Sequence, residues 1–148
     1  IEFMDVGTKN GWERSQVVTS KEVIEMIGNE FPLEPVDANY RGEVANRYRY
    51  VDGQGEIGFI SSVSEPFCGN CTRARLSTDG KLVTCLFASG GTDLKTAMRS
   101  GADDAEIAGI IARVWGGRTD RYSELRSKDT EFKAGVDGDK VEMYYIGG

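Results

Sequence analysis

The chain has 148 residues, of which 39% are hydrophobic and 28% charged, a composition that fits one globular domain with a core of its own. Its formal net charge of −6 argues against nonspecific binding to nucleic acid, which favours a basic surface. Neither an apolar run of the roughly 20 residues that a membrane helix needs nor a signal peptide pattern is present, so we expect a cytoplasmic protein.

The first third of the chain predicts a strand, a loop and a helix. Residues 1–6 form an apolar run typical of a buried strand, and Thr19 and Glu22 match the capping box that begins a helix. Pro32 marks the end of this helix. Domains seldom begin in mid-strand, so we expect this chain to be a piece of a longer protein. The expected buried face of the helix consists of Val23, Met26, Ile27 and Phe31.

The middle of the chain predicts antiparallel sheet. Residues 47–52 and 56–62 form two strand-like runs around a glycine turn. Residues 75–78 and 81–87 form two more, and the Asp-Gly dipeptide at 79–80 between them is a strong hairpin signal.

Two helices follow in the prediction. Thr92 caps the first, which ends at Gly101, and Asp103 with Glu106 forms a capping box for the second, which ends at the glycines 116–117. The inward residues of the first are Leu94, Ala97 and Met98, and those of the second are Ile107, Ile110, Ile111, Val114 and Trp115.

The last part of the chain gives weaker signals. Residues 118–138 are polar and predict a loop, whereas residues 140–146 alternate well enough to predict a closing strand.

Residues 53–58, GQGEIG, match the dinucleotide-binding pattern GxGxxG letter for letter. That pattern needs a helix that opens within it, because the pyrophosphate binds at the helix N-terminus. A strand-like run follows here, so we interpret residues 53–58 as a hairpin turn. Residues 90–92 lack the lysine and the spacing of a phosphate-binding loop.

All three cysteines, Cys68, Cys71 and Cys85, lie within residues 66–85, PFCGNCTRARLSTDGKLVTC, and the chain has no histidine. An odd, closely spaced set favours a metal or redox site in a reducing compartment over a disulfide framework. The CxxC spacing places two thiolates on one turn, and the predicted hairpin returns the third beside them.

The kind of metal stays open on spacing alone. Structural zinc sites are closed and four-coordinate, so zinc would need a carboxylate, a water or another subunit as its fourth ligand. A cluster of four irons and four sulfides can be held by three cysteines, which leaves one iron for an exogenous ligand. A zinc-binding interaction module and a plain structural domain with reduced thiols are the alternatives.

Two arginines follow the CxxC pair. Arg73 and Arg75 stand two residues apart, so an extended chain would present both guanidinium groups on one face. Paired guanidinium groups suit a phosphate or polyphosphate. Solvated surface arginines are the alternative interpretation.

Residues 67–87, FCGNCTRARLSTDGKLVTCLF, resemble the C-terminal cluster motif of the molybdenum cofactor biosynthesis protein A family. These radical S-adenosylmethionine (radical SAM) enzymes convert GTP to 3',8-cyclo-7,8-dihydro-GTP. Residues 31–68, the segment GGRTDRYSELR at 116–126 and the terminal IGG are similar to the family as well, so the resemblance covers essentially the whole chain.

The resemblance implies an α/β fold in two parts. Residues 1–35 would form the last βα unit of an incomplete TIM-like (β/α) barrel, and residues 36–148 an antiparallel sheet with helices, the cluster and GTP-binding domain. The barrel's own CxxxCxxC cluster, which cleaves S-adenosylmethionine, has no counterpart here, so we expect this chain by itself to be inactive. Its expected partners are the missing N-terminal barrel, GTP and a second copy of the chain as a homodimer.

The resemblance also assigns site residues. A substrate-binding 4Fe-4S cluster would sit on Cys68, Cys71 and Cys85, with GTP at its open iron. Met4 would lie beside S-adenosylmethionine. The residues expected near GTP are Arg73, Ala74 and Arg75, and those of the tail that reaches the active site are Gly147 and Gly148.

Overall fold

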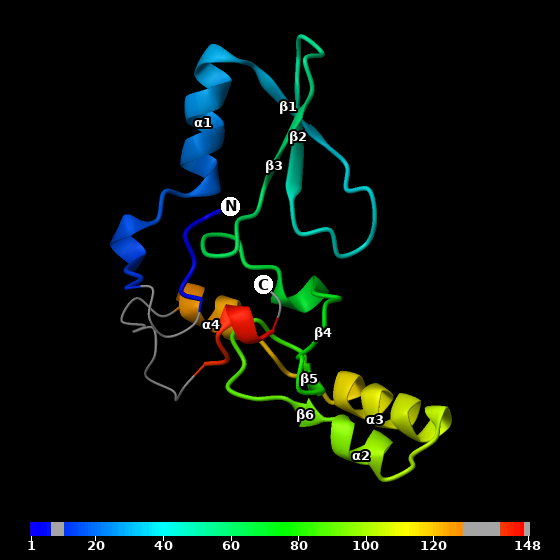
Figure 1. The fold of residues 1–148 in the computed structure, drawn as a ribbon. Helices are drawn as coiled ribbons and strands as arrows, with labels where there is room; N and C mark the ends of the chain where they lie inside the picture. The colour runs from blue at the N-terminus through cyan, green and yellow to red at the C-terminus, as the bar shows by residue number, and fades with distance from the viewer. Residues whose placement is uncertain (7–10, 129–139, 147–148) are drawn as a thin grey trace. The chain divides into compact units, whose positions relative to one another are not determined.

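The computed structural model describes residues 1–6, 11–128 and 140–146. They form two compact units, each described by itself below, and their elements are labelled in Figure 1. The described residues of unit 1 are 1–4, 12–72 and 121–128, and those of unit 2 are 5–6, 11, 73–120 and 140–146. No helix in these ranges is long and apolar enough to cross a membrane.

Unit 1 contains the predicted first helix, α1 (Ser20–Glu30). The Thr19 hydroxyl accepts a hydrogen bond from the Glu22 N–H at 3.2 Å, and the Glu22 carboxylate accepts one from the Thr19 N–H at 2.8 Å. This reciprocal pair is the predicted capping box, which satisfies N–H groups that a helix start leaves open. The helix ends before Pro32, as predicted. A 3₁₀ turn, η1 (Arg14–Gln16), precedes it.

The sheet of unit 1 has three antiparallel strands in the order β1 (Leu33–Val36), β2 (Asn46–Tyr50) and β3 (Glu56–Phe59). The β2–β3 hairpin was predicted, whereas β1 was missed because Pro35 weakens a strand signal. Proline is tolerated here since β1 is an edge strand.

The GxGxxG match is a hairpin turn, as predicted. Gly53 has φ 77° and Gly55 has φ 132°, conformations that L side chains rarely adopt. The Gly53 N–H donates to the Tyr50 carbonyl and the Tyr50 N–H to the Gly55 carbonyl, both at 3.0 Å. These bonds close the turn between β2 and β3, so no helix opens within the motif.

The prediction of a strand at residues 1–6 is wrong, because no strand forms there. The burial is also the reverse of the expected one: Glu2 and Asp5 are buried, whereas Ile1 and Phe3 are 75% and 42% exposed. The Glu2 N–H donates to the Ile60 carbonyl at 3.2 Å, but a strand needs a ladder of such bonds with a neighbour. Polar anchoring of the buried Glu2 carboxylate holds the segment in its place.

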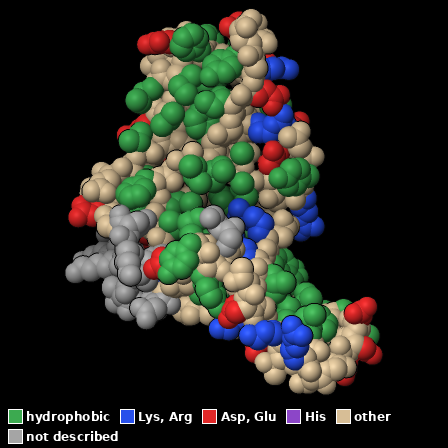
Figure 2. Space-filling model, in the orientation of Figure 1, with side chains coloured by type: hydrophobic (Ala, Val, Ile, Leu, Met, Phe, Trp, Pro, Cys, Tyr) green, Lys and Arg blue, Asp and Glu red, His purple; other side chains and the backbone are tan. Residues whose placement is uncertain are grey.

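Unit 1 leaves apolar side chains accessible around α1 and its sheet. Met26 and Phe31, predicted to face inward, are 61% and 55% exposed, whereas Val23 and Ile27 are half-buried. Figure 2 shows hydrophobic side chains gathered on the visible face over α1 and the first sheet. A contiguous apolar surface of this kind is typical of an interaction site.

The predicted loop at 118–138 contains a helix instead, α4 (Tyr122–Lys128), and its residues 129–138 lie outside the described part of the chain. The polar sequence of α4 hid it, because its buried residues are Ser123 and Arg126 rather than apolar ones. The core of unit 1 contains Trp12, Phe59 and Val63.

Arg126 anchors α4 within unit 1 and is 1% exposed. Its Nη2 donates to the Ser62 carbonyl at 2.6 Å, and its guanidinium lies 5.7 Å from the ring centres of both Trp12 and Tyr122. A buried guanidinium requires such partners to offset its desolvation.

The sheet of unit 2 has the antiparallel order β4 (Arg75–Leu76), β5 (Lys81–Val83) and β6 (Thr92–Asp93). The predicted Asp-Gly hairpin joins β4 to β5, with Gly80 at φ 84° and its N–H donating to the Ser77 carbonyl at 2.9 Å. The strands are shorter than predicted, and residues 84–87 leave the sheet after Val83.

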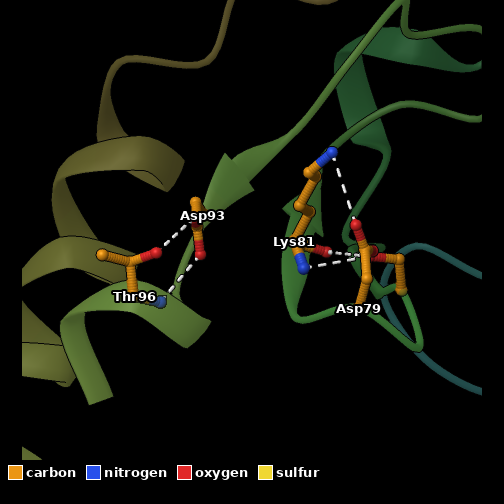
Figure 3. Close-up of polar contacts among 5 residues, drawn as sticks. Asp79, Lys81, Asp93 and Thr96 are labelled. Atoms are coloured by element: carbon orange, nitrogen blue, oxygen red, sulfur yellow. Dashed lines mark hydrogen bonds and ion pairs between the residues drawn. The ribbon is translucent and has the colours of Figure 1, made fainter. Parts of the chain in front are cut away.

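The two predicted helices of unit 2 are present as α2 (Lys95–Arg99) and α3 (Asp104–Gly116). The Asp103–Glu106 capping box of α3 is confirmed, whereas Thr92 does not cap α2 because it belongs to β6. The N-cap residue is Leu94, and the Asp93 carboxylate just before it accepts from the Thr96 N–H at 2.9 Å (Figure 3). Met98, which was expected to face inward, is 61% exposed. Ile111 and Trp115 of α3 were also expected to face inward, and they are 40% and 39% exposed.

The predicted closing strand at 140–146 is also wrong. Met143–Tyr145 form a 3₁₀ turn, η3. The Val141 N–H donates to the Ala88 carbonyl at 2.8 Å, and Ile146 is 3% exposed, so a single backbone hydrogen bond and a buried side chain, rather than a strand ladder, hold this segment.

Candidate functional site

The CxxC pair lies on one tight turn of unit 1, as its spacing predicts. The turn is a 3₁₀ helix, η2 (Cys68–Asn70), closed by the Cys71 N–H, which donates to the Cys68 carbonyl at 3.3 Å. Cys68 and Cys71 are both half-buried. Both sulfur atoms therefore belong to a single short piece of backbone, the arrangement that lets two thiolates reach one metal centre.

Helix α4 holds this turn through Glu124, a residue that the sequence did not single out. The Glu124 Oε1 accepts a hydrogen bond from the Gly69 N–H at 3.0 Å, between the two cysteines. Its Oε2 accepts one from the Arg121 guanidinium at 2.8 Å, which orients the carboxylate. The signal that could have found Glu124 is the segment GGRTDRYSELR, whose second half becomes α4.

Gly42 lies against the chain that leaves the turn. Its φ is 84°, and a Cβ added there would lie 2.6 Å from the Thr72 Oγ1 and 3.2 Å from the Asn70 carbonyl oxygen. Any side chain at this position would therefore collide with residues that flank Cys71.

Cys85 lies in unit 2, on a turn that follows β5. The Phe87 N–H donates to the Cys85 Sγ at 3.4 Å, and the Ala88 N–H donates to the Cys85 carbonyl at 3.2 Å. A hydrogen bond from a backbone N–H to a ligand sulfur is one of the interactions that tune iron–sulfur centres. Cys85 is also half-buried.

Thr84, the residue before Cys85, is held by Asp120, which lies in the first half of the GGRTDRYSELR segment at 116–126. The Thr84 hydroxyl donates to the Asp120 Oδ2 at 2.7 Å, and the Arg118 Nε donates to the same oxygen at 3.0 Å. The Arg118 guanidinium lies 5.0 Å from the Trp115 ring centre. Asp120 is thus a second residue near a cysteine that sequence reasoning missed.

The two arginines lie at the start of unit 2. Arg73 and Arg75 are half-buried, whereas Ala74 and Leu76 between and after them are exposed. This alternation agrees with the prediction that the two guanidinium side chains share one face of an extended segment.

The hairpin between β4 and β5 carries an ion pair that steadies its turn. The Lys81 Nζ lies 3.4 Å from the Asp79 Oδ2, and the Ser77 hydroxyl donates to the Asp79 Oδ1 (Figure 3). The hydrogen bonds from Ser77 and then Tyr145 hold the pKa of Asp79 well below its usual range, and Asp79 raises the pKa of Lys81. Both groups therefore stay charged at neutral pH.

The donor chemistry of the three cysteines suits an iron–sulfur cluster, since all three are half-buried and one sulfur accepts a backbone N–H. Cys68 and Cys71 are described with unit 1 and Cys85 with unit 2. Within the described ranges no three His, Cys, Asp or Glu side chains are grouped so as to hold a metal ion. The three-thiolate set therefore stays a prediction.

Comparison with known proteins decides the family. A sequence model of the family described as Molybdenum Cofactor Synthesis C matches residues 1–124. The chain belongs to this family. The match includes all three cysteines as well as Arg73 and Arg75, and it ends within α4.

Curated relatives of this Molybdenum Cofactor Synthesis C chain are named GTP 3',8-cyclase. The chain is 51% identical over 148 residues to the one from Xanthomonas campestris pv. campestris, 48% over 149 residues to that of Staphylococcus saprophyticus and 46% over 168 residues to that of Acidothermus cellulolyticus. All of this chain is covered in each case, but only 42%, 43% and 46% of the respective relative. The chain therefore spans less than half the length of these relatives.

Two site predictions remain, one for Met4 and one for the glycines Gly147 and Gly148. Met4 is half-buried in a segment that forms no strand, so its predicted place at the end of a barrel strand has no support here, and its contact with S-adenosylmethionine stays a prediction. Gly147 and Gly148 lie outside the described residues.

Proposed function

We propose that this chain is the C-terminal part of a GTP 3',8-cyclase of molybdenum cofactor biosynthesis. In this proposal Cys68, Cys71 and Cys85 hold a substrate-binding 4Fe-4S cluster. The observation that carries it is the set of three half-buried cysteines in a chain that is about half identical, over its whole length, to proteins of that name. A reducing cytoplasm would keep these thiols available.

The neighbouring residues would bind GTP. The cluster, when bound, would supply one iron without a protein ligand, to which the guanine could attach. Arg73 and Arg75, on one side of an extended segment with Ala74 between them, would bind the nucleotide's phosphates, because guanidinium groups form charge-assisted hydrogen bonds with phosphate oxygens. The chain's role would be to hold and orient the substrate.

The rest of the enzyme would come from the part of the relatives that this chain does not span. A TIM-like barrel with a second 4Fe-4S cluster would bind and cleave S-adenosylmethionine near Met4, and the Gly147-Gly148 tail would reach the active site. The exposed Met26 and Phe31 on α1 offer an apolar surface for that barrel or, in the isolated chain, for a second copy. Alone, the chain would not catalyse the reaction.

Anaerobic reconstitution with iron and sulfide tests the cluster. We expect the protein to take up about four irons, and the Cys68→Ser variant to lose that uptake because one of three thiolate ligands is gone. A Thr72→Ser variant, which changes a neighbour but no ligand, should match the parent. Equal cluster uptake by Cys68→Ser would contradict the assignment, and stoichiometric zinc that iron and sulfide cannot displace would favour the zinc module.

The double variant Arg73→Ala/Arg75→Ala tests the nucleotide site in the full-length enzyme. We expect GTP binding to weaken by at least roughly 100-fold, since the two lost charge-assisted hydrogen bonds contribute about 1.5–3 kcal/mol each. Equilibrium binding measures the affinity for GTP, and the iron content measures the cluster, which should remain.

The control variant Arg99→Ala/Arg113→Ala removes the same charge from exposed positions of α2 and α3, so it should bind GTP normally. Unchanged affinity in the first variant would remove these arginines from the site.

A further inference from the structure

The turn that carries Cys85 is held by the C-terminal segment of unit 2. The Val141 N–H donates to the Ala88 carbonyl at 2.8 Å, and the Lys140 Nζ lies 5.4 Å from the centre of the Phe87 ring. Phe87 and Ala88 are the two residues whose N–H groups donate to the Cys85 Sγ and the Cys85 carbonyl. The contacts therefore run from residues 140–141 through residues 87–88 to the sulfur atom.

Lys140 is itself fixed by a buried ion pair. Its Nζ donates to the Asp5 carbonyl oxygen at 3.1 Å and to the Asp5 Oδ2 at 3.2 Å, and the two side chains are 7% and 1% exposed. A buried pair of this kind adds little net stability, because desolvation offsets the attraction, but it strongly disfavours any geometry that separates the charges. The ammonium group is thus held at one place against the Phe87 ring.

We propose that Lys140 is a positioning residue for the third thiolate. With Asp5 it fixes the Phe87 ring and hence the N–H that donates to the Cys85 Sγ, so the geometry at this sulfur depends on the C-terminal segment. Only the link to a cluster rests on the proposed function, because the coupling between Lys140 and the Cys85 turn is a property of unit 2 alone. Hydrogen bonds to ligand sulfurs shift cluster potentials, which gives the coupling a measurable consequence.

The coupling is tested first by amide hydrogen exchange of the metal-free chain. We expect Lys140→Met to raise the exchange rates of the Phe87, Ala88 and Val141 amides at least 10-fold, since it removes the charge that orders the turn. The exchange of the Ile110 amide in α3 should stay within twofold of the parent. Lys21→Met, which removes an exposed charge from α1, should change none of these rates.

Lys140→Met leaves the Asp5 carboxylate buried without its ammonium partner, which destabilises the fold as a whole. The double variant Asp5→Leu/Lys140→Met removes both charges at similar volume, so it should fold with a melting temperature near that of the parent. It should still show the faster exchange at Phe87, Ala88 and Val141. Parent-like exchange at these three amides in the folded double variant would overturn the proposal.

The link to the cluster is tested in the reconstituted full-length enzyme. We expect the double variant to keep its iron content but to shift the midpoint potential and the electron paramagnetic resonance signal of the three-cysteine cluster, whereas Lys21→Met shifts neither. An unshifted potential would overturn the step from the turn to the cluster. If no cluster forms on the cysteines in the parent, the proposed function fails, while the exchange data on the metal-free chain still decide the role of Lys140.

Discussion

The Glu2→Gln variant is expected to lose about 3 kcal/mol of unfolding free energy, because two buried donors would face an amide NH₂ in place of a carboxylate oxygen. Glu2 is 5% exposed, and its two oxygens accept from the N–H groups of Ser20 and Val63 at 2.8 Å and of Ser64 at 2.9 Å. The Ser64 hydroxyl is a fourth donor. Urea unfolding followed by Trp12 fluorescence in a Trp115→Phe background measures the loss, since the chain has two tryptophans.

The matched control is Glu25→Gln, which removes an exposed carboxylate from α1 and should change the free energy of unfolding by less than about 0.5 kcal/mol. A loss below 1 kcal/mol in Glu2→Gln would mean that the four donors find water or other acceptors. In that case Glu2 would not be the group that holds residues 1–4 in unit 1.

The same carboxylate makes stability depend on pH in a defined direction. Burial raises the pKa of Glu2, but the hydrogen bonds from the Ser64 hydroxyl and from the backbone of Ser20, Ser64 and Val63 outweigh it, so the pKa is lowered. A lowered folded-state pKa contributes stability that is fully present above the unfolded value of about 4.3 and is lost as pH falls through the folded value. The parent should therefore lose more stability below pH 4 than Glu2→Gln does.

The Arg126→Ala variant is expected to lose about 3 kcal/mol of unfolding free energy as well. It removes a fully buried side chain from between two rings and leaves the Ser62 carbonyl without its donor at 2.6 Å. Arg126→Lys should also lose stability, because an ammonium group on a flexible stem does not replace the planar guanidinium. Unfolding in urea, followed by the same Trp12 signal, measures both.

Arg41→Ala serves as the control for Arg126, because it removes an exposed guanidinium and should stay within about 0.5 kcal/mol of the parent. A small loss in Arg126→Ala would show that α4 is anchored by other contacts. If the loss of unfolding free energy is large, we expect the CxxC turn to be disturbed as well, because the same helix presents Glu124 to the Gly69 N–H.

The elements that could be predicted from the sequence are those with local determinants. The capping boxes of α1 and α3 satisfy their own backbone groups within one helical turn, and the glycine-containing hairpins at 53–55 and 79–80 need a backbone conformation that glycine adopts readily. These signals depend on few neighbours, so they agree with the structure.

The elements that could not be predicted depend on distant partners. Residues 1–6 and 140–146 have strand-like patterns, but in unit 1 the Glu2 carboxylate and in unit 2 the Lys140–Asp5 pair hold them without a strand ladder. Helix α4 was missed because its buried side chains are the polar Ser123 and Arg126. Arg126 contacts Trp12 and Ser62, more than 60 residues away along the chain.

The candidate site divides in the same way. The CxxC turn and the alternation of Arg73 and Arg75 follow from spacing, which sequence displays directly. Glu124 and Asp120, which contact residues beside the cysteines, come from a segment about 50 residues away from the CxxC turn, and spacing carries no information on such contacts.

Gly42 has a consequence for substitutions in this family. It lies in the loop between β1 and β2, where alanine would differ from glycine by a single methyl group. Yet its methyl group would meet the Thr72 side chain at 2.6 Å, next to Cys71, in a backbone conformation that disfavours any L residue. Gly42→Ala is therefore expected to disturb the backbone on either side of Cys71, one of the proposed cluster ligands.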